Sequence, residues 1–369
     1  MVGRGKWILR TVTYLLASLP LCAQTRPSPA ASQRQAATQA AAEGHTDRAL
    51  RLYAECLAKT PDWTEGWWEY GKLLYGSHQF PEAARAFGRL TRLAPGNPLG
   101  FALLGLCEYE EGDWNNASLH LNKSLAMHVG MPAAISGAAA YHLGLALLHQ
   151  HDGEDALMVL KTLYRQSPDY PGLAPALGAA QLNLDQVPPS DSPLLAAVQT
   201  AGVAAIAVLQ DRKKDAEDAY RTLLAQFPAQ PYVHLGYGIL LESEHRDEEA
   251  TGEFLAESKV NPGSAVPWLW LGRIALDQQD AARSREYALK ARKLNPDDAL
   301  SFLIEGRGLM LEREWQSALA PLREAERREP QSSEVHYSLA SVYKELHRSK
   351  DAAQERQLFL QTTNSGNEP

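Results

Sequence analysis

Cysteine is scarce in this chain of 369 residues, which contains only three. Cys22 lies in a distinctive N-terminal segment, so Cys56 and Cys107 are the only cysteines in the rest of the sequence. Two cysteines cannot build the disulfide framework that stabilises many small exported domains. The fold must therefore be held by packing, and a hydrophobic content of 45% is sufficient for a core.

Positive charge is also in deficit. The chain has 36 lysines and arginines against 44 acidic residues, a net charge of −8. An acidic protein has too few cations to displace the counterions of nucleic acids or to bind anionic membrane surfaces. Beyond the N-terminal segment there is no hydrophobic run long enough to span a bilayer. We therefore expect no nucleic-acid partner and no membrane span in the mature chain.

Motifs that carry catalysis are missing as well. The sequence contains no HExxH, GxSxG, CxxC or GxxxxGK[ST]. We predict that the protein is not an enzyme, with no catalytic residues, no cofactor and no metal site.

The first 23 residues have the layout of a secretory signal peptide. Arg4, Lys6 and Arg10 form a basic region, a short apolar run follows, and "LCA" precedes a cleavage site after Ala23. Cleavage would leave 33 positive and 44 negative residues, a net charge of −11. Two alternatives are an uncleaved N-terminal anchor and a lipoprotein modified at Cys22. The prediction is an exported protein, periplasmic or secreted.

A 34-residue period runs through the remainder of the chain. Prolines mark it at Pro61 and Pro95, and again at Pro228, Pro262, Pro296 and Pro330. A glycine precedes most such prolines by 24 residues, as at Gly71, Gly144, Gly238, Gly272 and Gly306. Twelve residues after the glycine comes an alanine, and four further on a bulky apolar residue, as in Gly71, Ala83 and Phe87. This is the periodicity of stacked helical hairpins.

The pattern, with Trp67-x-x-Tyr70-Gly71 and Trp268-x-x-Leu271-Gly272 upstream, resembles the tetratricopeptide repeat family. The resemblance implies an all-α fold, a right-handed α-solenoid of stacked helix-turn-helix units. Nine units are predicted, at 30–63, 64–97, 98–131, 137–170, 197–230, 231–264, 265–298, 299–332 and 333–366.

Residues 171–196 interrupt the period. They contain the pattern of a first helix without a matching second helix, followed by the turn-rich "DQVPPSDSP". We therefore predict an N-terminal block at 24–185, a linker at 186–192, a C-terminal block at 193–366 and a tail at 367–369. The break is interpreted either as a hinge or as a rigid continuation of the stack.

Trp268 and Trp270 lie two apart in a predicted helix, so they should point to nearly opposite sides. We expect Trp268 to face the second helix of its own unit and Trp270 to face the second helix of the preceding unit. A helix that is apolar all round is one packed between neighbours.

Some positions depart from the pattern. The first helix of unit 30–63 is rich in alanine and is expected to fray or to act as a leader. In unit 265–298 the bulky position holds Ala288, so Tyr287 is expected to repack. Glu305 occupies a position that is apolar elsewhere and should find a partner.

Histidine is a common metal ligand, and His149-x-His151 places two histidines close together in the sequence. However, His78, His151, His245 and His347 all fall at the turn between the two helices of their units. Recurrence at a turn indicates a structural role. Trp114, Trp315 and Phe80 all start second helices and are interpreted as core residues.

The resemblance places the first helices along a concave groove that holds a peptide or a partner segment. One side of each first helix faces the second helix of its own unit, and another side faces the preceding unit. The remaining side is expected to face the groove. The positions on this side are Trp68, Lys72, Tyr75, Leu106, Tyr109, Tyr141, Leu145, Leu148, Ile239, Leu269, Arg273, Arg307, Met310, Tyr337 and Lys344. Amphipathic aromatic residues are common anchors of recognition surfaces.

The sequence therefore predicts a non-catalytic exported scaffold that binds a partner protein or peptide segment in its groove. The alternative is a structural component of an envelope export or assembly complex that uses its convex faces and ends.

Overall fold

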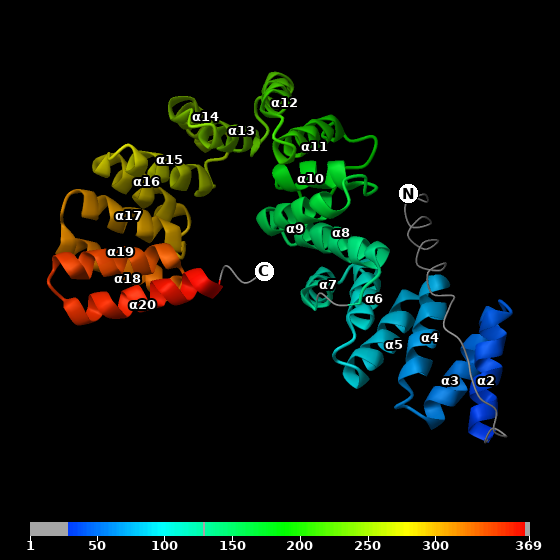
Figure 1. The fold of residues 1–369 in the computed structure, drawn as a ribbon. Coiled ribbons are helices and arrows are strands. Elements are labelled where there is room, and N and C mark those ends of the chain that lie inside the picture. The colour runs from blue at the N-terminus through cyan, green and yellow to red at the C-terminus, as the bar shows by residue number, and fades with distance from the viewer. Residues whose placement is uncertain (1–28, 128–129, 366–369) are drawn as a thin grey trace. The chain divides into compact units, whose positions relative to one another are not determined.

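The computed structural model describes residues 29–127 and 130–365 (Figure 1). These residues form nineteen α-helices, and no β-strand occurs among them. The all-α class and the repeated helix-turn-helix architecture are thus confirmed. The predicted signal peptide at 1–23 and the tail at 367–369 lie outside the described residues. Within the described ranges, no helix combines the length and the apolar character that a membrane span requires.

The helices divide into two compact parts, Met1–Asp211 and Arg212–Pro369. The first part contains five successive helix pairs. Their members are α2 (Pro29–Ala42), α3 (Thr46–Lys59), α4 (Thr64–Gly76), α5 (Phe80–Leu93), α6 (Pro98–Glu110), α7 (Trp114–Ala126), α8 (Ala133–His149), α9 (Gly153–Gln166), α10 (Leu173–Gln181) and α11 (Leu195–Leu209).

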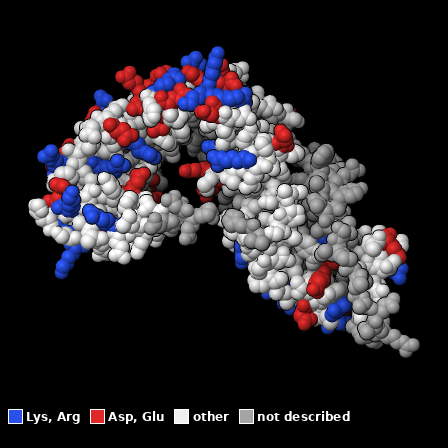
Figure 2. All heavy atoms as spheres, viewed as in Figure 1, with Lys and Arg blue, Asp and Glu red and all other residues white. Residues whose placement is uncertain are grey.

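The second part begins with a single helix, which packs on the first of four helix pairs. Its helices are α12 (Lys213–Gln226), α13 (Val233–Ser243), α14 (Asp247–Val260), α15 (Val266–Asp277), α16 (Ala281–Leu294), α17 (Ala299–Leu311), α18 (Trp315–Arg328), α19 (Ser333–Glu345) and α20 (Ser349–Ser365). Figure 2 shows acidic and basic side chains intermingled over α12 and α14, where Arg246 forms ion pairs with Glu217, Glu244 and Glu249.

Glycine lets the two helices of a hairpin approach closely. A Cβ atom on Gly71 would lie 2.7 Å from the ring of Phe87, and one on Gly105 would lie 2.7 Å from the Leu121 side chain. The same relationship joins Gly144 to Leu160, Gly238 to Phe254 and Gly306 to Leu322. The predicted glycine, alanine and bulky positions therefore form the core of each of these hairpins.

The turn inside each hairpin uses one residue in the left-handed conformation. His78, His151, His245 and His347 have φ angles of 58° to 59°, and Gln279 and Arg313 adopt the same conformation. The structure thus confirms that the recurring histidines occupy turns. Glycine and asparagine are favoured there, but a polar side chain that points to solvent is tolerated.

The predicted unit 197–230 is wrong. Its first helix, α11, packs on α10 as the second helix of a pair, and its second helix, α12, belongs to the second compact part. The boundary between the parts falls at Asp211 and Arg212, and the predicted linker 186–192 lies inside the first part. The physical reason is that glycines allow α10 and α11 to approach closely and pair. A Cβ atom on Gly178 or on Gly202 would lie 1.9 Å or 2.1 Å from a carbonyl oxygen of the opposing helix.

The alanine-rich α2 is a packed helix, contrary to the expectation that it frays. Ala37 and Ala40 are buried against Tyr53 of α3, and Tyr53 in turn stacks on Trp63. Small side chains allow close helix contact even where a helix has few large residues to bury.

The two tryptophans of α15 pack as predicted. The Trp268 ring stacks on Tyr287 of α16 at 5.9 Å, and the Trp270 ring stacks on Phe254 of α14 at 5.7 Å. Tyr287 does not fill the space beside Ala288, however. Ile304 of α17 fills it, 3.0 Å from where a Cβ on Gly272 would lie.

The first helices of neighbouring pairs also contact one another. In the first part α6 contacts α8 and α8 contacts α10, and in the second part α15 contacts α17 and α17 contacts α19. Among the described helices, the second helices of neighbouring pairs make no comparably extensive contact. The first helices are therefore the closely spaced side of each stack, which we call its inner face.

Candidate partner-binding surface

Five aromatic rings form a continuous series on and beside the inner face of the first part, here called the aromatic strip. Trp114 lies 5.0 Å from Tyr109, which lies 4.8 Å from His142, measured between ring centroids. His142 lies 5.4 Å from Tyr141, which lies 5.2 Å from Tyr170. All except His142 are half-buried, so each exposes part of its ring to solvent.

The strip is assembled by helix packing. Tyr109 comes from α6, Tyr141 and His142 come from α8, Trp114 starts α7 and Tyr170 follows α9. Consecutive residues on a helix point about 100° apart, so His142 is buried against α6 while Tyr141 faces outward. His142 Nδ1 lies 2.7 Å from the Ala138 carbonyl oxygen, which fixes the ring orientation.

The phenol groups of the strip stay neutral. Burial raises the pKa of Tyr109 and of Tyr170 above the ordinary value of 10. The Tyr141 hydroxyl donates a hydrogen bond to the Gly172 carbonyl oxygen at 3.4 Å. Neutral tyrosines offer an apolar ring together with a polar hydroxyl, and this combination suits contact with a polypeptide.

Trp114 extends the strip to His149. The two rings lie parallel, with centroids 4.0 Å apart and an angle of 11°. Gln150 supports this arrangement, because its side-chain amide donates to the Trp114 carbonyl oxygen and to the Ser118 hydroxyl, both at 2.9 Å. The sequence position of Trp114 suggested a core residue, but the side chain also has a role at the surface. It links α6 to α8 at the edge of the inner face.

Three other predicted groove residues of the first part lie at half-buried positions. Trp68 is half-buried and edge-on to Phe87 at 6.1 Å. The Lys72 Nζ lies 5.6 Å from the Trp68 ring centroid and 2.8 Å from a Glu69 carboxylate oxygen. Leu145 is half-buried on α8. These predicted positions on α4 and α8 are therefore partly accessible to solvent.

Three predicted groove residues are instead part of the core. Tyr75, Leu106 and Leu148 are 7%, 2% and 0% exposed. The prediction for Leu106 and Leu148 is wrong because α6 contacts α8 and α8 contacts α10, so side chains between these first helices are covered. Tyr75 is covered in a different way, because it packs edge-on against Phe80 of α5, the second helix of its own pair, at 5.5 Å.

The inner face of the second part is more polar. Arg273, Arg307 and Lys344 are exposed, and Tyr337 is 60% exposed, whereas Ile239, Leu269 and Met310 are half-buried. The Arg273 guanidinium lies 5.3 Å from the Trp270 ring, and Arg307 forms an ion pair with Glu334 at 3.7 Å. This face has separate basic groups but no continuous series of rings like that of the first part.

The structure also shows the surroundings of Glu305 and of the His149 and His151 pair. Glu305 forms an ion pair with Arg292 of α16, whose guanidinium also lies over the Phe302 ring. His149 and His151 do not form a metal-ligand pair with a third group in the described residues, because His149 stacks on Trp114 and His151 occupies its turn.

Tyr170, His142, His149 and the exposure of Trp114 were not predicted from the sequence. Tyr170 lies in a loop between repeats, where no periodicity assigns a direction to its side chain. His142 adjoins the predicted Tyr141, but a lone histidine on an apolar helix gives no signal of its own.

Comparison with known proteins matches the tetratricopeptide repeat family to residues 34–98 and 69–128, from within α2 to the end of α7. The sequence matches no curated protein. Among solved structures, MamA from Desulfovibrio magneticus RS-1 is 14% identical and covers 46% of this chain and 96% of its own, with a TM-score of 0.42. Cut9 in its APC/C complex with Hcn1 is 11% identical, covers 98% and 90%, and has a TM-score of 0.41. Yeast Tom70 is 10% identical, covers 91% of each chain, and has a TM-score of 0.36.

Proposed function

We propose that this protein is an exported, non-catalytic scaffold that binds an extended or helical segment of a partner protein on the aromatic strip. The observation that carries the proposal is the series of ring contacts from Trp114 through Tyr109, the buried His142 and Tyr141 to Tyr170, in which every ring except His142 is half-buried. Tetratricopeptide repeats are in general protein-interaction modules, and the match to residues 34–128 covers α6 and α7.

The chemistry of the strip favours an apolar or aromatic segment with a few polar groups. Partly exposed rings bury apolar area at a small cost in side-chain entropy, because their orientations are already fixed by ring contacts. Lys72, the basic residue among the predicted groove positions of this part, forms an ion pair with Glu69 at 2.8 Å. The surface therefore selects by shape and apolar contact more than by charge.

The competing proposal is a structural component that uses its outer faces. One observation favours considering it, since Leu119 of α7 and Met158 of α9 are each 60% exposed on second helices. Both are large apolar side chains on the face opposite to the first helices. A partner that covers this side would make the protein an assembly component.

The two proposals are separated by a paired substitution experiment. Tyr109→Ala combined with Tyr141→Ala removes the centre of the strip, and Leu119→Ser combined with Met158→Ser alters the outer face. Partners cross-linked to each tagged full-length form in the source cells are compared by mass spectrometry. Binding on the strip predicts partner loss in the tyrosine variant and retention in the other. The opposite result would favour the outer-face component.

Export is tested on the same full-length chain. Cell fractionation followed by N-terminal sequencing of the purified protein is expected to place it outside the cytoplasm, with residue 24 as the first residue. An intact N-terminus on a membrane-bound protein would favour the anchor, and a lipid on Cys22 would favour the lipoprotein.

A further inference from the structure

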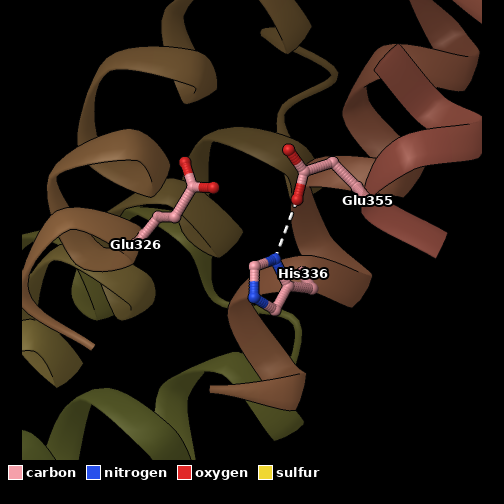
Figure 3. Close-up of side chains that lie close together, drawn as sticks. All are labelled: Glu326, His336 and Glu355. Carbon is pink, nitrogen blue, oxygen red and sulfur yellow. Dashed lines mark hydrogen bonds and ion pairs between the residues drawn. The ribbon is translucent and has the colours of Figure 1, made fainter. Parts of the chain in front are cut away.

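Three side chains of the kinds that bind transition metals meet where α18, α19 and α20 pack together (Figure 3). Glu326, His336 and Glu355 each contribute one potential ligand atom, and the three atoms lie within 4.8 Å of one another. The side chains of His336 and Glu355 are only 2% and 9% exposed, and Glu326 is half-buried. Because each residue comes from a different helix, no local sequence motif indicates that the three side chains lie together.

The hydrogen bonds of His336 define where its free electron pair points. Its Nε2 lies 2.9 Å from the Pro330 carbonyl oxygen, which only accepts, so Nε2 carries the proton. Its Nδ1 lies 2.8 Å from a Glu355 carboxylate oxygen. In a neutral imidazole this places a lone pair against another acceptor. A positive charge, either a proton or a metal ion, must therefore lie between them.

Glu326 distinguishes these two possibilities. Within the described part of the chain it forms no hydrogen bond and no ion pair, although its carboxylate faces the same space as Glu355 (Figure 3). A proton on Nδ1 would satisfy Glu355 alone. A divalent cation would satisfy both carboxylates and the imidazole at once.

We propose that Glu326, His336 and Glu355 form a binding site for one divalent transition metal ion, of which zinc fits the donor set best. His336 would bind through Nδ1 and each glutamate through one oxygen, which leaves a fourth position for water. This goes beyond the proposed scaffold function, which involves residues of the other compact part. It also differs from the sequence-based expectation of no metal site.

Binding of an ion requires small movements in both directions, since His336 and Glu355 must separate slightly and Glu326 must approach them. With zinc–ligand distances of about 2.0–2.2 Å, tetrahedral ligand atoms lie roughly 3.4 Å apart. The Nδ1 of His336 and the Glu355 oxygen are already closer than this, at 2.8 Å. Rotation of the flexible Glu326 side chain can supply the remaining movement. The Pro330 carbonyl oxygen orients the ring, as an outer hydrogen-bond partner commonly does for a metal-binding histidine.

The repeat provides an internal comparison. His234 of α13 and Glu253 of α14 occupy the same places three 34-residue repeats earlier, with Nδ1 and the carboxylate oxygen 2.6 Å apart. The place of Glu326 is taken there by Leu224 of α12. A histidine–glutamate contact is thus one of the side-chain pairs this hairpin position accepts. The third carboxylate is what distinguishes the group at His336.

The comparison gives a matched variant. Glu326→Leu reproduces the surroundings of His234, which the fold already accommodates, and His234→Gln removes a histidine from the two-ligand pair as a control. The full chain without a polyhistidine tag is stripped with a chelator and titrated with Zn²⁺ by calorimetry. Binding of Co²⁺ is followed by its visible absorption, which reports a tetrahedral site.

We expect one Zn²⁺ per chain, a tetrahedral Co²⁺ spectrum and at least about a tenfold loss of affinity in Glu326→Leu, with no loss in His234→Gln. Failure of the wild type to bind stoichiometrically, or equal affinity in Glu326→Leu, would overturn the proposal. Circular dichroism establishes that each variant is folded, and Glu326→Gln replaces Glu326→Leu if the latter is not. Partner capture by the tyrosine variants is measured separately, so the two proposals can fail independently.

Discussion

Tyr109 lies edge-on to His142, with ring centroids 4.8 Å apart and an angle of 81° between the rings. This contact joins α6 to α8 and lies at the centre of the aromatic strip. His142 is buried, and its Nδ1 donates to the Ala138 carbonyl oxygen at 2.7 Å. The aromatic strip therefore includes a buried histidine, and burial favours its neutral form.

This contact predicts a dependence of stability on pH. Burial lowers the pKa of His142 below its ordinary value of 6.5, so the folded state binds the proton less readily than the unfolded state. Its contribution is fully present above the unfolded pKa and is lost as pH falls toward the folded pKa. We expect the free energy of unfolding to decrease below pH 6.5, by at most about 1.4 kcal/mol per pH unit for this group.

Urea unfolding at pH 7.5, 6.5 and 5.5 measures this effect, with His142→Asn as the control that keeps a short side-chain donor. The stability difference between wild type and variant should shrink as pH falls. A difference that is the same at all three pH values would show that His142 does not titrate in this range.

Because α10 and α11 lie so close together, we predict that one methyl group added at Gly178 will strongly lower the free energy of unfolding. A Cβ on Gly178 would lie 1.9 Å from the Val198 carbonyl oxygen, and backbone cannot move aside as a side chain can. We expect Gly178→Ala to lower the free energy of unfolding by about 3 kcal/mol or more. In α5, Gly88 has nothing within 4 Å of its Cβ position, so Gly88→Ala should stabilise by about 0.5–1 kcal/mol.

Thermal and urea unfolding of the two glycine variants provide the measurement. Equal effects at both positions would mean that the α10–α11 contact is not as close as the structure has it. The comparison also tests the correction of the predicted unit 197–230, because it probes the helix pair that replaces that unit.

Position 288 holds alanine where other repeats have a bulky apolar residue. We predict that placing a bulky residue at this position will destabilise the protein. Ile304 already occupies the space that a phenylalanine would take, close to Gly272. We expect Ala288→Phe to cost about 1–3 kcal/mol, and the double variant with Ile304→Ala to recover part of that loss. A double-mutant cycle of unfolding free energies checks this, and purely additive effects would contradict the exchange of one side chain for the other.

The ion pair between Arg292 and Glu305 predicts a modest, salt-dependent contribution. Both side chains are partly solvated, with exposed fractions of 26% and 19%. We expect Glu305→Gln to lower the free energy of unfolding by about 0.5–1 kcal/mol at low salt and by less at 1 M NaCl. A loss unaffected by salt would indicate that packing, and not charge, explains the role of Glu305.

The sequence determined the helical hairpin, its 34-residue period and the residues inside it. Those features follow from local rules, since glycine, alanine and a bulky residue at fixed spacing allow two helices to pack, and a left-handed turn closes them. The opposite directions of Trp268 and Trp270 and the accessibility of Tyr109 and Tyr141 follow from helix geometry in the same way.

The tertiary structure alone decided which helices pair when the period breaks, and which inner residues stay accessible. Gly178 and Gly202 direct α11 to α10, contacts between neighbouring first helices bury Leu106 and Leu148, and Phe80 of α5 helps to cover Tyr75. The meeting of Glu326, His336 and Glu355 also depends on it, because three separate helices bring them together. Periodicity specifies the faces of one helix, whereas burial and convergence depend on what its neighbours place against those faces.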